Sequence, residues 1–259
     1  MTIDPSLWIL VVLFFVIIAA IYSAVGFGGG SSYLAILSLL GFSFFFIRTN
    51  ALLCNLVVVS ASSFLFYKNK IISFKDVLPF IVASIPMTFI GASLRLDESI
   101  FFVLLAITLI GSSFSLLWQT FLNKKENQKI IKYPYYISYV LGASIGILSG
   151  LVGIGGGVFL SPILNHLKWG KPMKIAGLTA FFILANSISG LLGLVINKTF
   201  EYSLFSTIPL LFAVFIGGQI GVRYSIKRNN SKWIKIFTAV LVLIVGIRIL
   251  FLRGVEYFF

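Results

Sequence analysis

Acidic, histidine and cysteine side chains are all scarce in this chain of 259 residues. It contains seven acidic residues, one histidine and one cysteine. A single cysteine excludes a disulfide framework and a site built from several thiolates. The sequence also has no cluster of residue types that bind metals. We therefore expect no metal and no cofactor.

Charge of either sign is also sparse, because charged residues make up 10% of the chain and hydrophobic residues 59%. A soluble domain usually has about 25% charged and about 45–50% apolar residues. A bilayer is spanned by about 20 apolar residues, and runs near that length occur at 7–25, 50–67, 77–94, 100–122, 135–151, 176–196, 204–222 and 234–251. The sequence predicts an all-α, polytopic protein in a lipid bilayer. Because no Lys or Arg precedes the first run, we expect a retained membrane helix there and not a cleaved signal peptide.

Glycine is concentrated in two similar motifs inside apolar sequence. Residues 25–30 read VGFGGG and residues 152–157 read VGIGGG. Each glycine weakens a helix by about 1 kcal/mol, and non-helical backbone is tolerated at membrane depth only where protein or a water-lined cavity surrounds it. We predict that each motif is the tip of a hairpin of broken helices. After each tip a new helix should start, at Ser31 and at Val158.

The basic residues support these hairpins. If each motif enters and returns on the same side, fifteen of the 20 Lys and Arg residues fall on one side of the membrane. The other side then carries five: Arg48 in a predicted loop at 42–49, Arg95, Lys198, Arg248 and Arg253. If each motif lay in a single crossing, the division would be ten against ten. The positive-inside rule therefore favours hairpins in the cell membrane, with the lysine-rich side cytoplasmic and both termini extracytoplasmic. The basic charge thus indicates topology, and we expect no nucleic-acid partner.

The two halves match beyond the glycines. Thr49 aligns with Thr179, Lys68 with Lys198, and Pro79 with Pro209. We predict one transmembrane domain over 1–259, formed by a first repeat at 1–122, a cytoplasmic linker at 123–132 and a second repeat at 133–259. Each half has one hairpin pair and three crossings, so the second half is inverted. Transporters with this architecture bind substrate at the midplane, where their broken helices meet.

Two helix N-termini directed at one region suit a small anion, because unpaired N–H groups and the positive end of the helix dipole face it. Serine, threonine and asparagine side chains nearby can add hydrogen bonds. The candidate substrate-binding residues are Gly26, Gly28, Gly29, Gly30, Ser31, Ser32, Asn55, Gly153, Gly155, Gly156, Gly157, Thr179 and Asn186. The alternative for each is a purely structural role in close helix packing.

The doubled G-x-G-G-G motifs, the length of each half and the Thr–Gly spacing resemble the TauE/SafE sulfite-exporter family of membrane transporters. The resemblance covers nearly the whole chain and implies transport of small sulfur-containing anions, such as sulfite or organosulfonates, across the bacterial cytoplasmic membrane. An anion channel of the same architecture would give almost the same sequence pattern. An intramembrane enzyme is the other alternative, with Ser149 and His166 as its nucleophile and base. Because these two have no further catalytic partners, we expect no enzyme.

Overall fold

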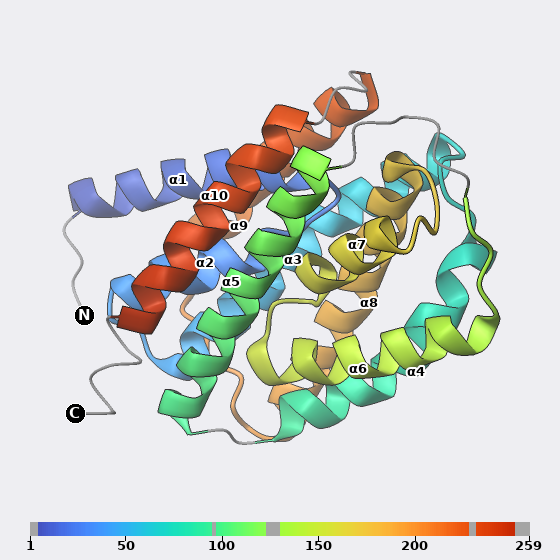
Figure 1. The fold of residues 1–259 in the computed structure, drawn as a ribbon. Coiled ribbons are helices and arrows are strands. Elements are labelled where there is room, and N and C mark those ends of the chain that lie inside the picture. The colour runs from blue at the N-terminus through green and yellow to red at the C-terminus, as the bar shows by residue number, and fades with distance from the viewer. Residues whose placement is uncertain (1–4, 95–96, 123–129, 228–231, 252–259) are drawn as a thin grey trace.

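The computed structural model describes residues 5–94, 97–122, 130–227 and 232–251 (Figure 1). The predicted linker lies largely outside the described residues, as do both ends of the chain. In these four ranges the chain forms helices and no strand, which confirms the predicted all-α class. The helices are α1 (Pro5–Ser23), α2 (Gly30–Leu39), α3 (Phe44–Lys68), α4 (Phe74–Ser93), α5 (Glu98–Leu122), α6 (Tyr135–Val152), α7 (Gly157–His166), α8 (Pro172–Ile196), α9 (Leu204–Lys227) and α10 (Lys232–Ile249).

Within the described ranges, six helices are long and apolar enough to cross a membrane: α1, α3, α4, α6, α8 and α9. Helices α5 and α10 occupy the other two predicted apolar runs. The predicted loop at 42–49 is wrong, because α3 already begins at Phe44 after its N-cap Ser43, whose hydroxyl accepts from the Phe46 N–H at 3.2 Å. Arg48 consequently lies inside a membrane helix.

The outer surface is apolar and the interior holds polar side chains. Leu10, Leu13 and Phe14 of α1 are each about half exposed, and Phe212 of α9 is 66% exposed. In contrast, most asparagine, serine and threonine side chains of α3 and α8 are buried. This distribution fits a lipid environment, since hydrocarbon can cover the apolar surface while the polar side chains are kept inside the protein, away from lipid.

Helices α3 and α8 pack against each other at the centre of the molecule. Around them α4 packs along α6, α1 along α9, and α5 along α10. Figure 1 shows α4 and α6 side by side along one edge, with α1 at the opposite side of the molecule. The central pair carries most of the polar residues considered below.

Two helices, α2 and α7, are short, with 10 residues each. At 1.5 Å per residue they are about 15 Å long, half of a roughly 30 Å hydrocarbon core. They begin at Gly30 and Gly157, one residue before the starts expected at Ser31 and Val158. Helix α2 packs on α3, and α7 on α8. The glycine-rich segments that precede them, residues 24–29 (the first tip) and 153–156 (the second tip), therefore lie against the central pair.

Candidate functional site

The backbone of both tips adopts conformations that favour glycine. In the first tip Gly26 and Gly29 have φ of 82° and 91°. In the second tip Gly153, Gly155 and Gly156 have φ between 76° and 80°. A residue with a Cβ is strained in this left-handed region, whereas glycine adopts it readily. The last glycine of each tip is the N-cap of the short helix that follows.

The same glycines also allow close packing. A Cβ placed on Gly155 would lie 2.7 Å from Cγ2 of Ile183, and one on Gly156 would lie 2.9 Å from the Phe182 ring. A Cβ on Gly26 would collide with the backbone of Ala176. Backbone conformation and close packing thus explain why these positions are glycine without any ligand. Evidence for binding has to come from the polar groups around them.

Asn55 joins the two tips. Its Oδ1 accepts a hydrogen bond from the Gly30 N–H at 2.8 Å, and its Nδ2 donates to the carbonyl of Ile154 at 3.0 Å. The side chain is fully buried. One asparagine of α3 therefore caps the N-terminus of α2 and holds the second tip beside it, which brings Gly30 of the first motif close to the second motif.

The first tip is capped by Asn55, although Tyr33 Oη, which lies against Gly29, is buried without a partner among the described residues. The Gly30 N–H is taken by Asn55, and the hydroxyl groups of the two predicted serines are directed toward α1. Tyr22 Oη and Ser32 Oγ share a hydrogen bond of 2.7 Å, and Ser31 Oγ donates to Tyr22 Oη at 3.4 Å. Ser31 and Ser32 thus tie α2 to α1 and do not face Asn55 or the second tip.

The second tip lacks such a cap. Asn55 is the twelfth residue of α3, and the twelfth residue of α8 is Ile183. Ile183 lies over Gly155 and Gly157 as Asn55 lies over Gly28 and Gly30, but an isoleucine side chain accepts no hydrogen bond. Within the described residues the N–H groups of Gly157 and Val158 have no hydrogen-bond acceptor. The N-terminus of α7 is therefore open.

Buried polar side chains without partners surround this open end. The hydroxyls of Ser149, Thr179 and Ser187 and Oδ1 of Asn186 form no hydrogen bond within the described chain. They lie close to the tip, since a Cβ on Gly155 would be 3.3 Å from Ser187 Oγ, and a Cβ on Gly156 would be 3.1 Å from Ser149 Cβ. An unsatisfied buried polar group costs about 1–3 kcal/mol, so this cluster needs a ligand or water. Thr179 and Asn186 are predicted from the sequence, whereas Ser149 and Ser187 are not among the predicted site residues.

The hydrogen bonds of the second tip indicate which sign of charge it suits. Two carbonyls of the tip already accept hydrogen bonds from side chains: Ile154 from Asn55 Nδ2, and Gly155 from Asn186 Nδ2 at 3.5 Å. The Gly150 carbonyl, just before the tip, accepts from Arg48 Nη2 at 2.8 Å. The N–H groups of α7 remain free. Apart from the amide oxygen of Asn186, the open groups at this end are N–H donors and hydroxyls, which suit an anion better than a cation.

Arg48 lies beside the second tip and is 2% exposed. It is the one buried cation among the residues whose side-chain burial the structure describes. Its Nε has no partner, its guanidinium carbon lies 5.1 Å from the centre of the Phe44 ring, and the aliphatic part of its side chain packs on Gly153. Arg48 lies in the second turn of α3, where the positive end of the helix dipole does not favour a cation, so a buried arginine there calls for a reason.

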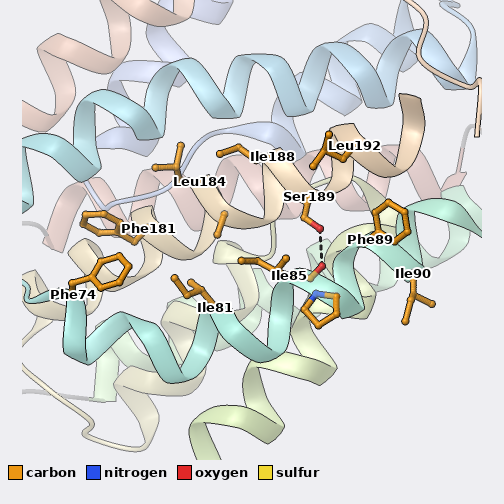
Figure 2. Close-up of a pocket in the computed structure, with 12 residues that line it drawn as sticks. Phe74, Ile81, Ile85, Phe89, Ile90, Phe181, Leu184, Ile188, Ser189 and Leu192 are labelled. Atoms are coloured by element: carbon orange, nitrogen blue, oxygen red, sulfur yellow. Dashed lines mark hydrogen bonds between the residues drawn. The ribbon is translucent and has the colours of Figure 1, made fainter. Parts of the chain in front are cut away.

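A second feature, an apolar groove, lies between α4 and α8 (Figure 2). It has a volume of about 700 Å³, and phenylalanine, isoleucine and leucine side chains form most of its lining. Ser189 faces it, but Ser189 Oγ donates to the Ile85 carbonyl at 2.6 Å. The groove therefore offers no charge or free donor to a small anion, in contrast to the second tip.

A family model described as "Sulfite exporter TauE/SafE" matches residues 10–249. The chain belongs to this family. Members of the family are membrane transporters, so the TauE/SafE assignment and the six apolar helices together establish a multi-pass membrane protein of the transporter type.

Three curated relatives agree. The chain is 32% identical over 238 residues to "Probable membrane transporter protein y4hK" of Sinorhizobium fredii, covering 91% of this chain and 95% of the relative. It is 30% identical to "Probable membrane transporter protein" of Haemophilus influenzae, over 61% of this chain and 56% of the relative. It is 27% identical to "Probable membrane transporter protein YunE" of Bacillus subtilis, over 71% and 73%. No solved structure matches the chain.

Proposed function

We propose that the protein transports small oxyanions, sulfite or organosulfonates among them, and binds them at the open N-terminus of α7 beside the second tip. The observation that carries the proposal is the cluster of unpartnered groups there: the N–H groups of Gly157 and Val158 and the hydroxyls of Ser149, Thr179 and Ser187, all of which can donate to an anion. The first tip has a supporting role. Its Gly30 N–H already donates to Asn55, which in turn holds the second tip in place. The sequence suggested two equivalent helix ends, and this proposal makes the α7 end the main one.

The proposal includes an inverted repeat with two re-entrant hairpins. Three regularities support it. The order of long and half-length helices is the same in α1–α5 and α6–α10. If α1 is matched with α6 and α4 with α9, the packed pair α4–α6 corresponds to the packed pair α9–α1, and α3 packs against its own counterpart α8. In such transporters the two halves rock about a central site, which opens to one side at a time.

The orientation that we propose places both termini outside the cell and the lysine-rich linker in the cytoplasm. Its support is the division of basic residues, fifteen against five. Cys54 is buried, which leaves a single cysteine introduced at Asn127 as the main reactive thiol. Labelling of that cysteine by an impermeant thiol reagent in intact cells would overturn this orientation.

The most specific part of the proposal is that the substrate contains sulfur. It rests on the description of the matched family, since the curated relatives are named only as probable membrane transporters. An oxyanion with several acceptor oxygens suits a site with several separate donors, because each oxygen can accept from a different N–H or O–H group.

Removal of the unpartnered hydroxyls tests the site. In proteoliposomes we expect Thr179→Val together with Ser187→Ala to raise the half-saturating sulfite concentration about tenfold or more, from charge-assisted hydrogen bonds of about 1.5–3 kcal/mol each. Folding stability should not fall, because these hydroxyls have no partner to lose.

Ser113→Ala is the matched control. Its buried hydroxyl donates to the Ala239 carbonyl at 2.7 Å, between α5 and α10, so this change should lower stability and leave the half-saturating concentration unchanged. Normal sulfite affinity in the double variant would mean that the substrate does not bind at the second tip.

A further inference from the structure

We propose that Arg48 is the fixed positive charge that binds the transported oxyanion and makes the site selective for oxyanions over halides. This inference rests on the function proposed above. Arg48 packs on Gly153, the first residue of the second tip, is 2% exposed and keeps Nε without a partner.

The charge of Arg48 is not neutralised by the protein. Among the described residues the one ion pair joins Lys174 to Asp76, at 2.9 Å, on other elements. Glu201, in the segment between α8 and α9, also lies near α3, because its backbone N–H donates to Thr49 Oγ1. Its carboxylate, however, accepts from Ser43 Oγ at 2.6 Å and forms no ion pair with Arg48. A buried charge without a counter-ion is costly, and a bound anion would supply the missing counter-charge.

A structural role explains one contact of Arg48 but not its charge. Nη2 donates to Gly150 in the last turn of α6, where the carbonyls have no partner within the helix and where a cation interacts favourably with the helix dipole. A neutral amide side chain could make the same hydrogen bond. The unpartnered Nε and the net charge are left over, and these are the features that an oxyanion uses.

The other half of the molecule shows that the tip does not need an arginine in order to pack. Arg48 is the fifth residue of α3 and contacts Gly153. The fifth residue of α8 is Ala176, whose backbone packs on Gly26, so that the first tip is packed without a charged side chain. The charge is therefore present at one tip only, and it is the tip whose helix end is open.

The guanidinium group of Arg48 also suits an oxyanion by its shape. The guanidinium group presents donors in a planar fork that matches two oxygens of an oxyanion, whereas a halide can use only one point of contact. The predicted substrate class is therefore the oxyanion.

The experiment compares wild type with Arg48→Gln, Arg48→Lys and Arg223→Gln. For each protein, transport of sulfite, methanesulfonate and chloride is measured in proteoliposomes, together with the thermal shift that each anion causes. Arg223 is an exposed arginine of α9, so Arg223→Gln is the matched loss of one charge. We expect Arg48→Gln to raise the half-saturating sulfite concentration about tenfold or more and to lose the sulfite-induced thermal shift. Arg48→Lys should keep anion binding but discriminate less between sulfite and chloride, and Arg223→Gln should match wild type.

The outcomes separate the two proposals. If wild type moves sulfite or methanesulfonate and Arg48→Gln has the same affinity and thermal shift, the anion site stands and Arg48 only caps α6. If folded wild type moves neither anion and shows no thermal shift, the proposed function fails and this inference fails with it. If Arg48→Gln does not fold, Arg48→Lys decides, and unchanged discrimination against chloride in that variant overturns the inference.

Discussion

At the scale of single residues, one carboxamide holds the two tips together. Asn55 accepts from Gly30 of the first tip's helix and donates to Ile154 of the second tip. Because both partners are buried backbone groups, removal of the side chain leaves two polar groups unsatisfied, at a cost of about 1–3 kcal/mol each.

We therefore expect Asn55→Ala to lower the free energy of unfolding in detergent by at least about 2 kcal/mol and to impair transport. Asn55→Asp keeps the acceptor for Gly30 but adds a negative charge beside the anion site, so it should abolish anion binding. The control is Asn69→Ala, which removes only an exposed bond to the Leu65 carbonyl. A stability loss no larger in Asn55→Ala than in Asn69→Ala would contradict the assigned role.

The sequence predicted Asn55, Thr179 and Asn186 by their helical spacing, and all three lie at the tips. It did not predict that the two tips differ. That difference depends on which residue faces each tip, Asn55 or Ile183, and can be read only when both helix starts are known. Arg48 was expected in a loop because the polar residues Arg48, Thr49 and Asn50 interrupt the apolar run, although the helix continues through them.

At the scale of elements, several helices end in the same way. After α3, α7 and α8 a lysine adopts a left-handed conformation: Lys70, Lys168 and Lys198 have φ between 53° and 55°. In each case the N–H of the next residue bonds back to the last turn, as Ile71 does to Phe66 and Thr199 does to Leu194. Helices commonly close with this pattern, usually with glycine at the left-handed position. Gly41 fills that position after α2.

This geometry predicts a stabilising substitution. Lys198 is exposed, and a residue with a Cβ pays roughly 1–2 kcal/mol in the left-handed region. Lys198→Gly should raise the free energy of unfolding in detergent by about 0.5–1 kcal/mol, after the entropic cost of glycine is subtracted. Lys198→Val should lower it. A loss of stability in the glycine variant would show that the lysine makes a contact that outweighs the strain.

The helix ends also correct the alignment of the halves. The sequence pairs Lys68 with Lys198, but the C-terminal turns place Lys198 in the position of Lys70. The predicted pairing of Thr49 with Thr179 is shifted in the same way, because Thr49 is the sixth residue of α3 and Thr179 the eighth of α8. From α4 and α9 onward the predicted pairing of Pro79 with Pro209 fits, because the connection from Asn197 to Ser203 is two residues longer than that from Asn69 to Ser73. Residue identity alone could not place this insertion, because asparagine, lysine and serine recur in both connections.

At the scale of the whole molecule, the distribution of acidic residues bears on the energy source. Of the seven in the chain, the four in the described ranges are Asp76 in the first turn of α4, Asp97 and Glu98 at the start of α5, and Glu201 between α8 and α9. None lies among the unpartnered groups of the second tip. Intramembrane carboxylates are the usual proton relays and coupling groups, so the proposed transport of anions needs another driving force.

The membrane potential can supply it. With the cytoplasm negative, each unit of negative charge that leaves gains about 2.3 kcal/mol per 100 mV, which corresponds to a concentration ratio of about 50-fold. Arg48 and the α7 N-terminus remain in the protein, so the net charge that moves is that of the anion. We therefore expect export that is electrogenic and independent of proton and sodium gradients.

The most direct measurement is sulfite flux in proteoliposomes that contain the purified protein, under a potassium–valinomycin potential, with no pH or sodium gradient. The account predicts saturable flux toward the positive side that grows with the potential and falls in the Thr179→Val, Ser187→Ala double variant. Flux that ignores the potential and requires a pH or sodium gradient would contradict the uncoupled mechanism, and potential-driven flux of cations in place of anions would contradict the site itself.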